Sequence, residues 1–152
     1  MDERERVLVT LAAMRVLMGI LWLSHLIWKL PPDFGRHRSS GLMHSFLWAE
    51  RYAVIGPLRD LVRDEVIPHY TVFGYIVFVV EAVAGISLLL GFYTRVGASI
   101  GLAGAIVIAL FVGGAPNVWR FGLVLFIAWH IVLLATPCAR RFSLDDRLGR
   151  DP

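Results

Sequence analysis

The sequence has little cysteine, lysine or charge. Cys138 is the single cysteine among 152 residues, and Lys29 is the single lysine. One thiol cannot form an intramolecular disulfide, a CxxC redox pair or a structural zinc site. Neither an HExxH metal motif, a GxGxxG motif nor a phosphate-binding loop occurs, so the sequence predicts no metal site and no nucleotide site of these kinds. Charged residues make up 18% of the chain, against about 25% in soluble domains.

Hydrophobic residues are abundant instead, at 57% of the chain with a mean hydropathy of +0.67. Soluble domains contain about 45–50%. A soluble domain of this length cannot bury so much apolar surface, and the same composition excludes disorder. We therefore expect membrane lipid to surround the protein.

The net charge of +3 does not indicate a nucleic-acid partner. The basic residues lie in loops and tails between apolar segments rather than on one face, as nucleic-acid binding would require. Basic residues in such positions instead fit the topology rules and the anionic headgroups of a bilayer.

Four apolar segments are long enough for membrane spans, which need about 20 residues. The segment behind the charged start is too long for a signal peptide, so we expect it to remain as a span. Short connections at 93–95 and 114–117 force antiparallel neighbours. The sequence predicts an all-α integral membrane four-helix bundle, a single domain over 1–152 with spans at about 7–30, 71–92, 96–113 and 118–136 and a basic tail at 137–152.

The connection from 31 to 70 is long for a compact domain, and its apolar residues recur at helical spacing. Pro57 is typical of a helix start and Pro68 of a stop. We predict two short amphipathic helices at the membrane interface; the alternative is a solvated loop with chance periodicity. The residues that carry the pattern are Leu42, Met43, Phe46, Leu47 and Val54, then Leu58, Leu61, Val62 and Val66.

Arg15, Glu81 and His130 are the candidate catalytic residues, because ionisable groups inside a membrane are costly and usually functional. With both termini on one side, their depths are roughly 12, 18 and 10 Å at about 1.5 Å per residue. We expect an Arg15–Glu81 ion pair, direct or through one water, since a lone buried charge costs more than a pair. One interpretation is a pocket that relays protons. The other is a structural tie that fixes helix register, with His130 as a hydrogen-bonded core residue.

The first span carries a polar stripe. Arg15, Met18, Trp22, His25 and Lys29 fall within an arc of about 80° at 100° per residue, so the stripe is expected to face protein. Together with Tyr75 of the second span, Trp22, His25 and Lys29 are the candidate binding residues for an anionic or quinone-like ligand. The alternative is a snorkelling Lys29 within an aromatic belt.

In the third span, Gly97, Gly101 and Gly104 form a small-residue pattern. Such spacing predicts close approach between helix backbones and carries no catalytic information.

Three segments resemble the DoxX/DoxD family of small bacterial membrane proteins. The first is Arg15-Val16-Leu17-Met18-Gly19 with His25 and Lys29-Leu30. The most specific runs from Glu81 through Gly85, Leu88-Leu89-Leu90-Gly91 and Thr94-Arg95. The last is Phe142-Ser143-Leu144-Asp145.

This resemblance implies four membrane helices with both termini cytoplasmic, in the bacterial inner membrane. The family includes the small subunit of thiosulfate:quinone oxidoreductase, and other members are linked to sulfur and oxidative-stress redox systems. The basic residues alone divide evenly, seven on each side. The compact Arg140–Arg141 pair favours cytoplasmic termini.

The leading hypothesis is a membrane subunit of a quinone-linked redox complex, with menaquinone or ubiquinone bound in the polar pocket and a protein partner or a second copy beside it. None of its residues stores electrons, so any redox cofactor comes from elsewhere. A non-catalytic anchor or assembly subunit is the alternative. A proton-coupled transporter is the third, although four spans are few for one.

Overall fold

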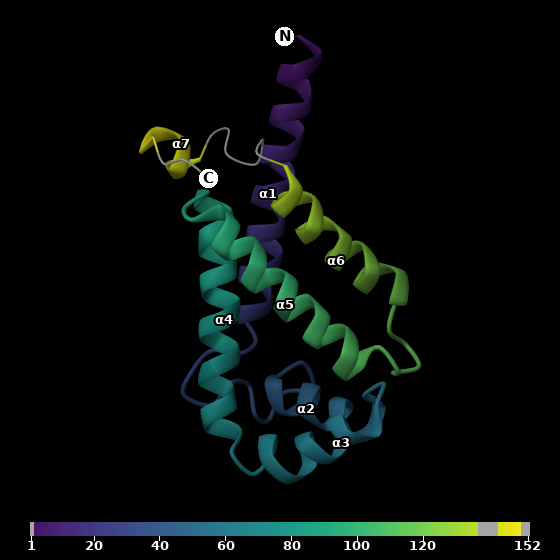
Figure 1. Ribbon diagram of the computed structural model, residues 1–152. Coiled ribbons are helices and arrows are strands. Elements are labelled where there is room, and N and C mark those ends of the chain that lie inside the picture. The colour runs from purple at the N-terminus through teal and green to yellow at the C-terminus, as the bar shows by residue number, and fades with distance from the viewer. Residues whose placement is uncertain (1, 137–142, 150–152) are drawn as a thin grey trace.

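The computed structural model describes residues 2–136 and 143–149, and this part of the chain is helical, with no strand. The all-α prediction is confirmed. Figure 1 shows the order of the elements: α1 (Glu3–Leu26), α2 (Leu42–Tyr52), α3 (Gly56–Leu61), the π-helix η1 (Val62–Val66), α4 (Tyr70–Leu90), α5 (Thr94–Val112), α6 (Arg120–Ala135) and α7 (Leu144–Arg147).

Three of these helices, α1, α4 and α5, are long and apolar enough to cross a membrane. They have 24, 21 and 19 residues. Helix α6 has 16 residues and is about 24 Å long, shorter than the bilayer core of about 30 Å. Three of the four predicted spans are therefore helices of sufficient length, and the segment predicted as the fourth span is a shorter apolar helix.

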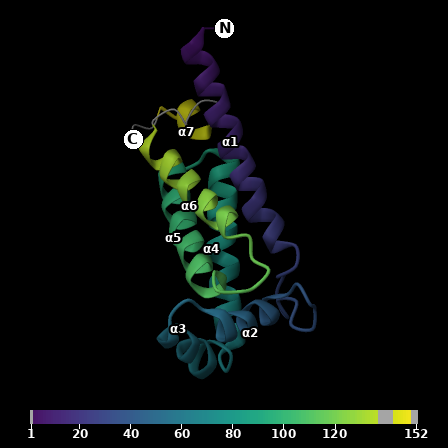
Figure 2. The same ribbon diagram turned by 90° about the vertical axis from the view of Figure 1, so that its right-hand side faces the viewer.

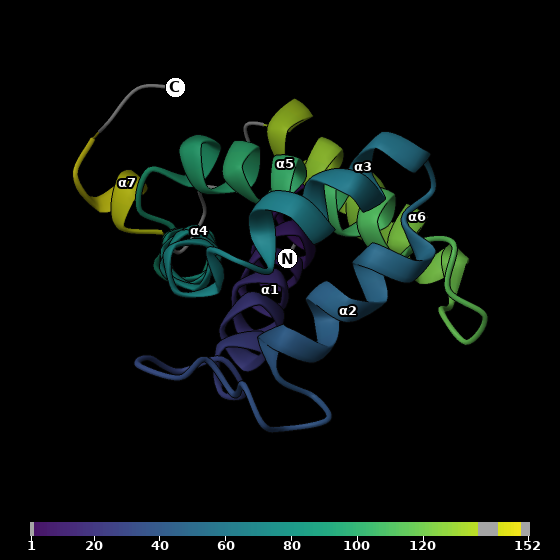
Figure 3. The same ribbon diagram turned by 90° about the horizontal axis from the view of Figure 1, so that it is seen from below.

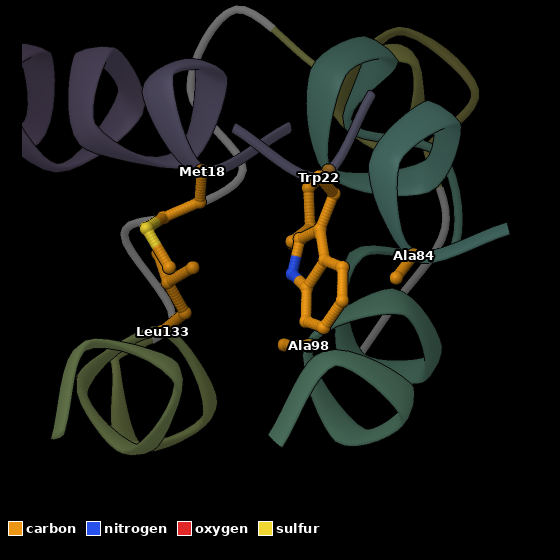
Figure 4. Close-up of a cluster of buried hydrophobic side chains, with 6 residues drawn as sticks. Met18, Trp22, Ala84, Ala98 and Leu133 are labelled. Atoms are coloured by element: carbon orange, nitrogen blue, oxygen red, sulfur yellow. The ribbon is translucent and has the colours of Figure 1, made fainter. Parts of the chain in front are cut away.

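The long helices surround a common interior, as the view from below shows (Figure 3). Helix α4 packs against α1 and α5, and α5 packs against α6. Large side chains close the remaining side, between α1 and α6. In Figure 4, Met18 of α1 points toward Leu133 of α6, and the Trp22 ring points into the interior toward Ala98 of α5.

Small residues on α5 make room for these side chains. A methyl group on Gly97 would lie 2.5 Å from Ser87 Cβ of α4. One on Gly101 would lie 2.6 Å from His130 Cδ2, and one on Gly104 would lie 2.9 Å from Trp22 Cη2. Real Cβ atoms do not approach this closely, so the glycine face accommodates side chains of α1, α4 and α6, and the predicted close approach of helix backbones stays a prediction.

Helix α1 is shifted lengthwise against α4. Gly19 of α1 lies against the Leu89 backbone near the end of α4. The first turns of α1 therefore project beyond α4, whereas α4 continues past the end of α1 at Leu26 (Figures 1 and 2). This stagger places Arg15 level with Gly91, at the end of α4, rather than with its middle.

The 31–70 connection folds back beneath the bundle, where α2 and α3 lie across its lower end (Figures 1 and 3). The predicted first helix is α2, and the predicted second one is α3 continued by η1, which ends before Pro68. Phe34 is fully buried and packs against Gly74 of α4. Val54 N–H donates to the Leu110 carbonyl at 2.9 Å. The segment is thus helical and packed, so the solvated-loop alternative is wrong.

The short helix α7 lies on the same side of the bundle as the start of α1 (Figure 1). Cys138 and the Arg140–Arg141 pair lie outside the described residues.

Candidate functional site

A buried ion pair joins the end of α1 to the middle of α4. Lys29 Nζ lies 2.6 Å from Glu81 Oε1, and the two side chains are 14% and 5% exposed. Lys29 stands in the turn after α1, where its N–H donates to the Leu26 carbonyl at 2.9 Å. The carbonyl end of a helix stabilises a cation. The turn therefore positions the single lysine of the chain to reach back to Glu81.

The predicted contact between Arg15 and Glu81 is wrong, because Glu81 pairs with Lys29 instead. The expected depths are measured from the side of the termini, and they hold only if the ends of the spans on that side lie level with one another. Because α1 is staggered, Arg15 lies at Gly91. Gly91 is ten residues beyond Glu81, about 15 Å along the helix.

The second oxygen of Glu81 distinguishes this carboxylate. Glu81 Oε2 is buried and has no hydrogen-bond partner among the described residues. A buried acceptor without a donor costs about 1–3 kcal/mol, so it normally has a partner such as a water or a ligand. His25, one turn before Lys29, lies on the exposed side of α1 and near enough for the charges of Lys29 and Glu81 to act on it. Lys29, Glu81 and His25 form the ion-pair site.

Arg15 belongs to a different cluster. It is fully buried, and its guanidinium packs against Gly91, which ends α4 with a φ of 64°. A side chain at Gly91 would overlap the guanidinium, whose Cζ lies 2.6 Å from the position of a Cβ. The carboxylate of Asp145 attracts the Arg15 charge.

Asp145, the second residue of α7, fastens this short helix to the α4–α5 turn. Its Oδ1 accepts the Tyr93 N–H at 2.9 Å, and its Oδ2 accepts the Thr94 N–H at 2.9 Å and the Thr94 hydroxyl at 3.1 Å. Its own N–H donates to the Gly91 carbonyl at 3.0 Å. The carboxylate thereby satisfies amides that open α5, where the helix dipole also favours a negative charge. We call Arg15, Gly91, Thr94 and Asp145 the tail clamp.

Sequence reasoning did not assign a role to Asp145, Thr94 or Ser87. The Ser87 hydroxyl reaches the Phe92 and Tyr93 carbonyls and closes the same turn. A search for charges inside spans misses these residues, because Asp145 and Thr94 stand outside the spans and Ser87 is uncharged. The signal was present in the Thr94-Arg95 and Ser143-Leu144-Asp145 segments that carry the family resemblance.

His130 and Trp22 form a third polar contact, in the interior. Trp22 Nε1–H donates to His130 Nε2 at 3.0 Å, and His130 Nδ1 lies 2.7 Å from the Phe126 carbonyl. Indole only donates, so His130 Nε2 accepts and Nδ1–H donates, which defines the neutral tautomer. Both ring nitrogens are therefore engaged by the protein. This geometry fits the core-histidine alternative, and a catalytic role for His130 stays a prediction.

The structure does not bring Arg15, Glu81 and His130 into one pocket, since each has a different neighbour. Tyr75 also lies apart from the ion-pair site. It is 48% exposed and packs edge-on against Phe34 with ring centroids 4.9 Å apart. Six residues separate it from Glu81, about 9 Å along α4. In residues 2–136 and 143–149, no group of three or more His, Cys, Asp or Glu residues could hold a metal ion.

Long apolar helices with a buried ion pair between two of them are typical of a helical membrane protein. Comparison with known protein families then shows which family it belongs to. A family model described as "TQO small subunit DoxD" matches residues 10–151. The chain therefore belongs to the DoxD family, the small membrane subunit of thiosulfate:quinone oxidoreductase. No curated protein and no solved structure matches the chain.

Proposed function

We propose that this protein is the membrane subunit of a quinone-linked redox complex in the bacterial inner membrane. Its family membership over 10–151 is the observation that carries the proposal. In this arrangement α6 and the residues around it complete a fourth crossing, and both termini are cytoplasmic. The side shared by α7 and the start of α1 agrees with that topology (Figure 1).

The ion-pair site fits a quinone headgroup better than the other polar contacts do. The Lys29 ammonium carries three N–H donors, and one of them donates to Glu81 Oε1. Glu81 Oε2 is an acceptor in need of a donor. Ile27, in the turn after α1, is exposed two residues before Lys29, and an isoprenoid tail would lie against it. A bound quinone supplies a two-electron acceptor that dissolves in the bilayer.

The chain's own residues then have distinct tasks. Lys29 and Glu81 hold the headgroup, and His25 adds a polar contact at the exposed side. Trp22, His130 and Arg15 fix the helices that form the site, and Tyr75 packs the 31–41 segment against α4. A partner subunit carries the chemistry of the electron donor.

Quinone content tests the proposal. Protein extracted in mild detergent should carry menaquinone or ubiquinone extractable by solvent, and Glu81→Gln should lower the amount per protein. Glu65→Gln is the matched control, because Glu65 is exposed on η1. Quinone-free protein whose melting temperature does not respond to added quinone would overturn the proposal.

A non-catalytic anchor is the second candidate, and the saturated contacts of Asp145 and His130 favour it, since both residues serve the fold. Replacing Arg15, Glu81 and His130 together separates the two functions. A complex that assembles normally and stays active after this change supports the anchor. Assembly without quinone-dependent activity supports the redox subunit.

A further inference from the structure

The two oxygens of Glu81 have different surroundings. Oε1 is bound by Lys29 Nζ at 2.6 Å, whereas Oε2 is buried with no partner among the described residues. An ionised carboxylate only accepts hydrogen bonds. The group that completes this site must therefore be a donor.

This requirement separates the two redox forms of a quinone. The oxidised form presents carbonyl oxygens, which accept, and the reduced hydroquinone presents hydroxyl groups, which donate. The remaining Lys29 donors can serve an oxygen of either form, so Lys29 does not discriminate. Glu81 Oε2 does discriminate, because it stays unsatisfied beside a carbonyl. Sites with a buried group that needs a ligand hydroxyl reject analogues without it strongly.

The site is placed for a ligand that arrives from the bilayer. Glu81 stands eleven residues after the start of α4, about 16 Å along the helix. Val79 and Val83 are exposed on the opposite face of α4, so a ligand would reach the pair from the α1 side. There Lys29 is 14% exposed, and His25, one turn before it, is exposed. A headgroup at Glu81 would thus enter past these two polar residues, next to the exposed apolar side chain of Ile27.

We infer that the ion-pair site selects the hydroquinone form, with one ligand hydroxyl donating to Glu81 Oε2. This inference rests on the proposed function and adds the redox form that the site retains. It also makes Lys29 the group that holds the Glu81 carboxylate in position, and it leaves Arg15 and His130 without ligand contact.

The direct test compares ligands on wild-type protein in nanodiscs. Anaerobic titration calorimetry with ubiquinol-1 and ubiquinone-1 should give a dissociation constant at least tenfold lower for the reduced form. The dimethyl ether of ubiquinol-1 has nearly the same shape but no hydroxyl donor, and should bind no better than ubiquinone-1. These ligand-side comparisons need no variant.

Variants then locate the preference. The double variant Lys29→Met/Glu81→Leu leaves no lone charge and should bind both forms with affinities equal within threefold. Glu65→Gln should keep the full preference. Circular dichroism and melting temperature verify that each protein is folded.

Each other result overturns the inference. Equal wild-type affinities, tighter ubiquinone-1 binding, or tight binding of the dimethyl ether removes the role of Oε2 and leaves the proposed function standing. A preference that survives in the folded double variant places the discriminating group elsewhere. Wild-type protein that binds neither form contradicts the proposed function itself, and the inference falls with it.

Discussion

Two buried carboxylates of this protein, Asp145 and Glu81, differ in how many of their oxygens accept hydrogen bonds. Asp145 is 7% exposed, and both of its oxygens accept hydrogen bonds from the turn that opens α5. Glu81 is 4% exposed, and only one of its oxygens has a partner among the described residues. The backbone amides of the α4–α5 turn saturate the first carboxylate. A single flexible lysine partners the second.

This difference distinguishes a buried carboxylate that stabilises the fold from one that can still bind a ligand. A carboxylate that satisfies a helix N-terminus holds the fold together and has no capacity left for a ligand. One with an unsatisfied oxygen keeps a binding capacity at a cost in stability. The following predictions test whether the tail clamp and the ion-pair site divide in this way.

The largest effect is expected at the ion pair. Glu81→Leu alone leaves the Lys29 ammonium buried without its counter-charge and should destabilise the protein by about 3–5 kcal/mol. The double variant Lys29→Met/Glu81→Leu should recover most of that loss. Unfolding in mixed micelles measures both values. Single variants as stable as wild type would show that the pair is not buried in the folded protein.

A somewhat smaller loss is expected at the tail clamp. Asp145→Ala removes the acceptor of two backbone amides and a hydroxyl and should cost about 2–3 kcal/mol, since hydrogen bonds to charged groups contribute about 1.5–3. Asp145→Asn keeps one oxygen and should cost less. Hydrogen exchange should become faster at the Tyr93 and Thr94 amides. Unchanged protection of those two amides would contradict the clamp. Quinone content should not change in either variant.

The hydrogen bond between Trp22 and His130 in the interior should contribute less to stability than the tail clamp does. Trp22→Phe removes the donor to His130 Nε2 and should cost about 1–3 kcal/mol, because a buried acceptor is left unsatisfied. The Nε2 resonance of His130 should then move, because the indole N–H no longer donates to this nitrogen. Nitrogen NMR of protein labelled at histidine measures the change. An Nε2 resonance identical to that of wild type would show that the Trp22 contact is not formed.

The smallest effect is expected on the exposed surface of η1. The Arg63 side chain, bonded to Asp64 at 2.9 Å, holds the pKa of the Asp64 carboxyl below its ordinary value. A lowered pKa stabilises the fold above the unfolded pKa, and this is lost as pH falls through the folded value. Because both groups are exposed, Arg63→Gln should raise the pKa of Asp64 with no resolvable change in melting temperature at pH 7. A clear drop in melting temperature would show that the pair is structural.

Sequence patterns were sufficient for the helices and insufficient for their alignment. Apolar run length locates α1, α4 and α5, and helical spacing with Pro57 locates α2 and α3, because both signals are local. The stagger of α1 depends on how Gly19 and Gly85 fit the facing helix, which no local pattern encodes.

The same limit applies to the candidate site. The cost of an ionisable group inside a membrane identified Glu81 as a candidate, and the polar stripe of the first span identified Lys29. Their pairing follows from the lengthwise shift of α1 against α4, which the sequence does not show. Asp145 could not be assigned, because its partners Tyr93 and Thr94 are 52 and 51 residues away in the sequence. The family resemblance marks the segment around Asp145, but no local pattern indicates which residues its carboxylate binds.

Carboxyl-carbon NMR of protein labelled at aspartate and glutamate tests the central contrast most directly. On addition of ubiquinol-1 under anaerobic conditions, the Glu81 resonance should shift as Oε2 accepts a hydrogen bond, while the Asp145 resonance should stay in place. Assignments come from Glu81→Gln and Asp145→Asn. A stationary Glu81 resonance at saturating ligand, or a shift at Asp145 instead, would contradict the division between a binding carboxylate and a structural one.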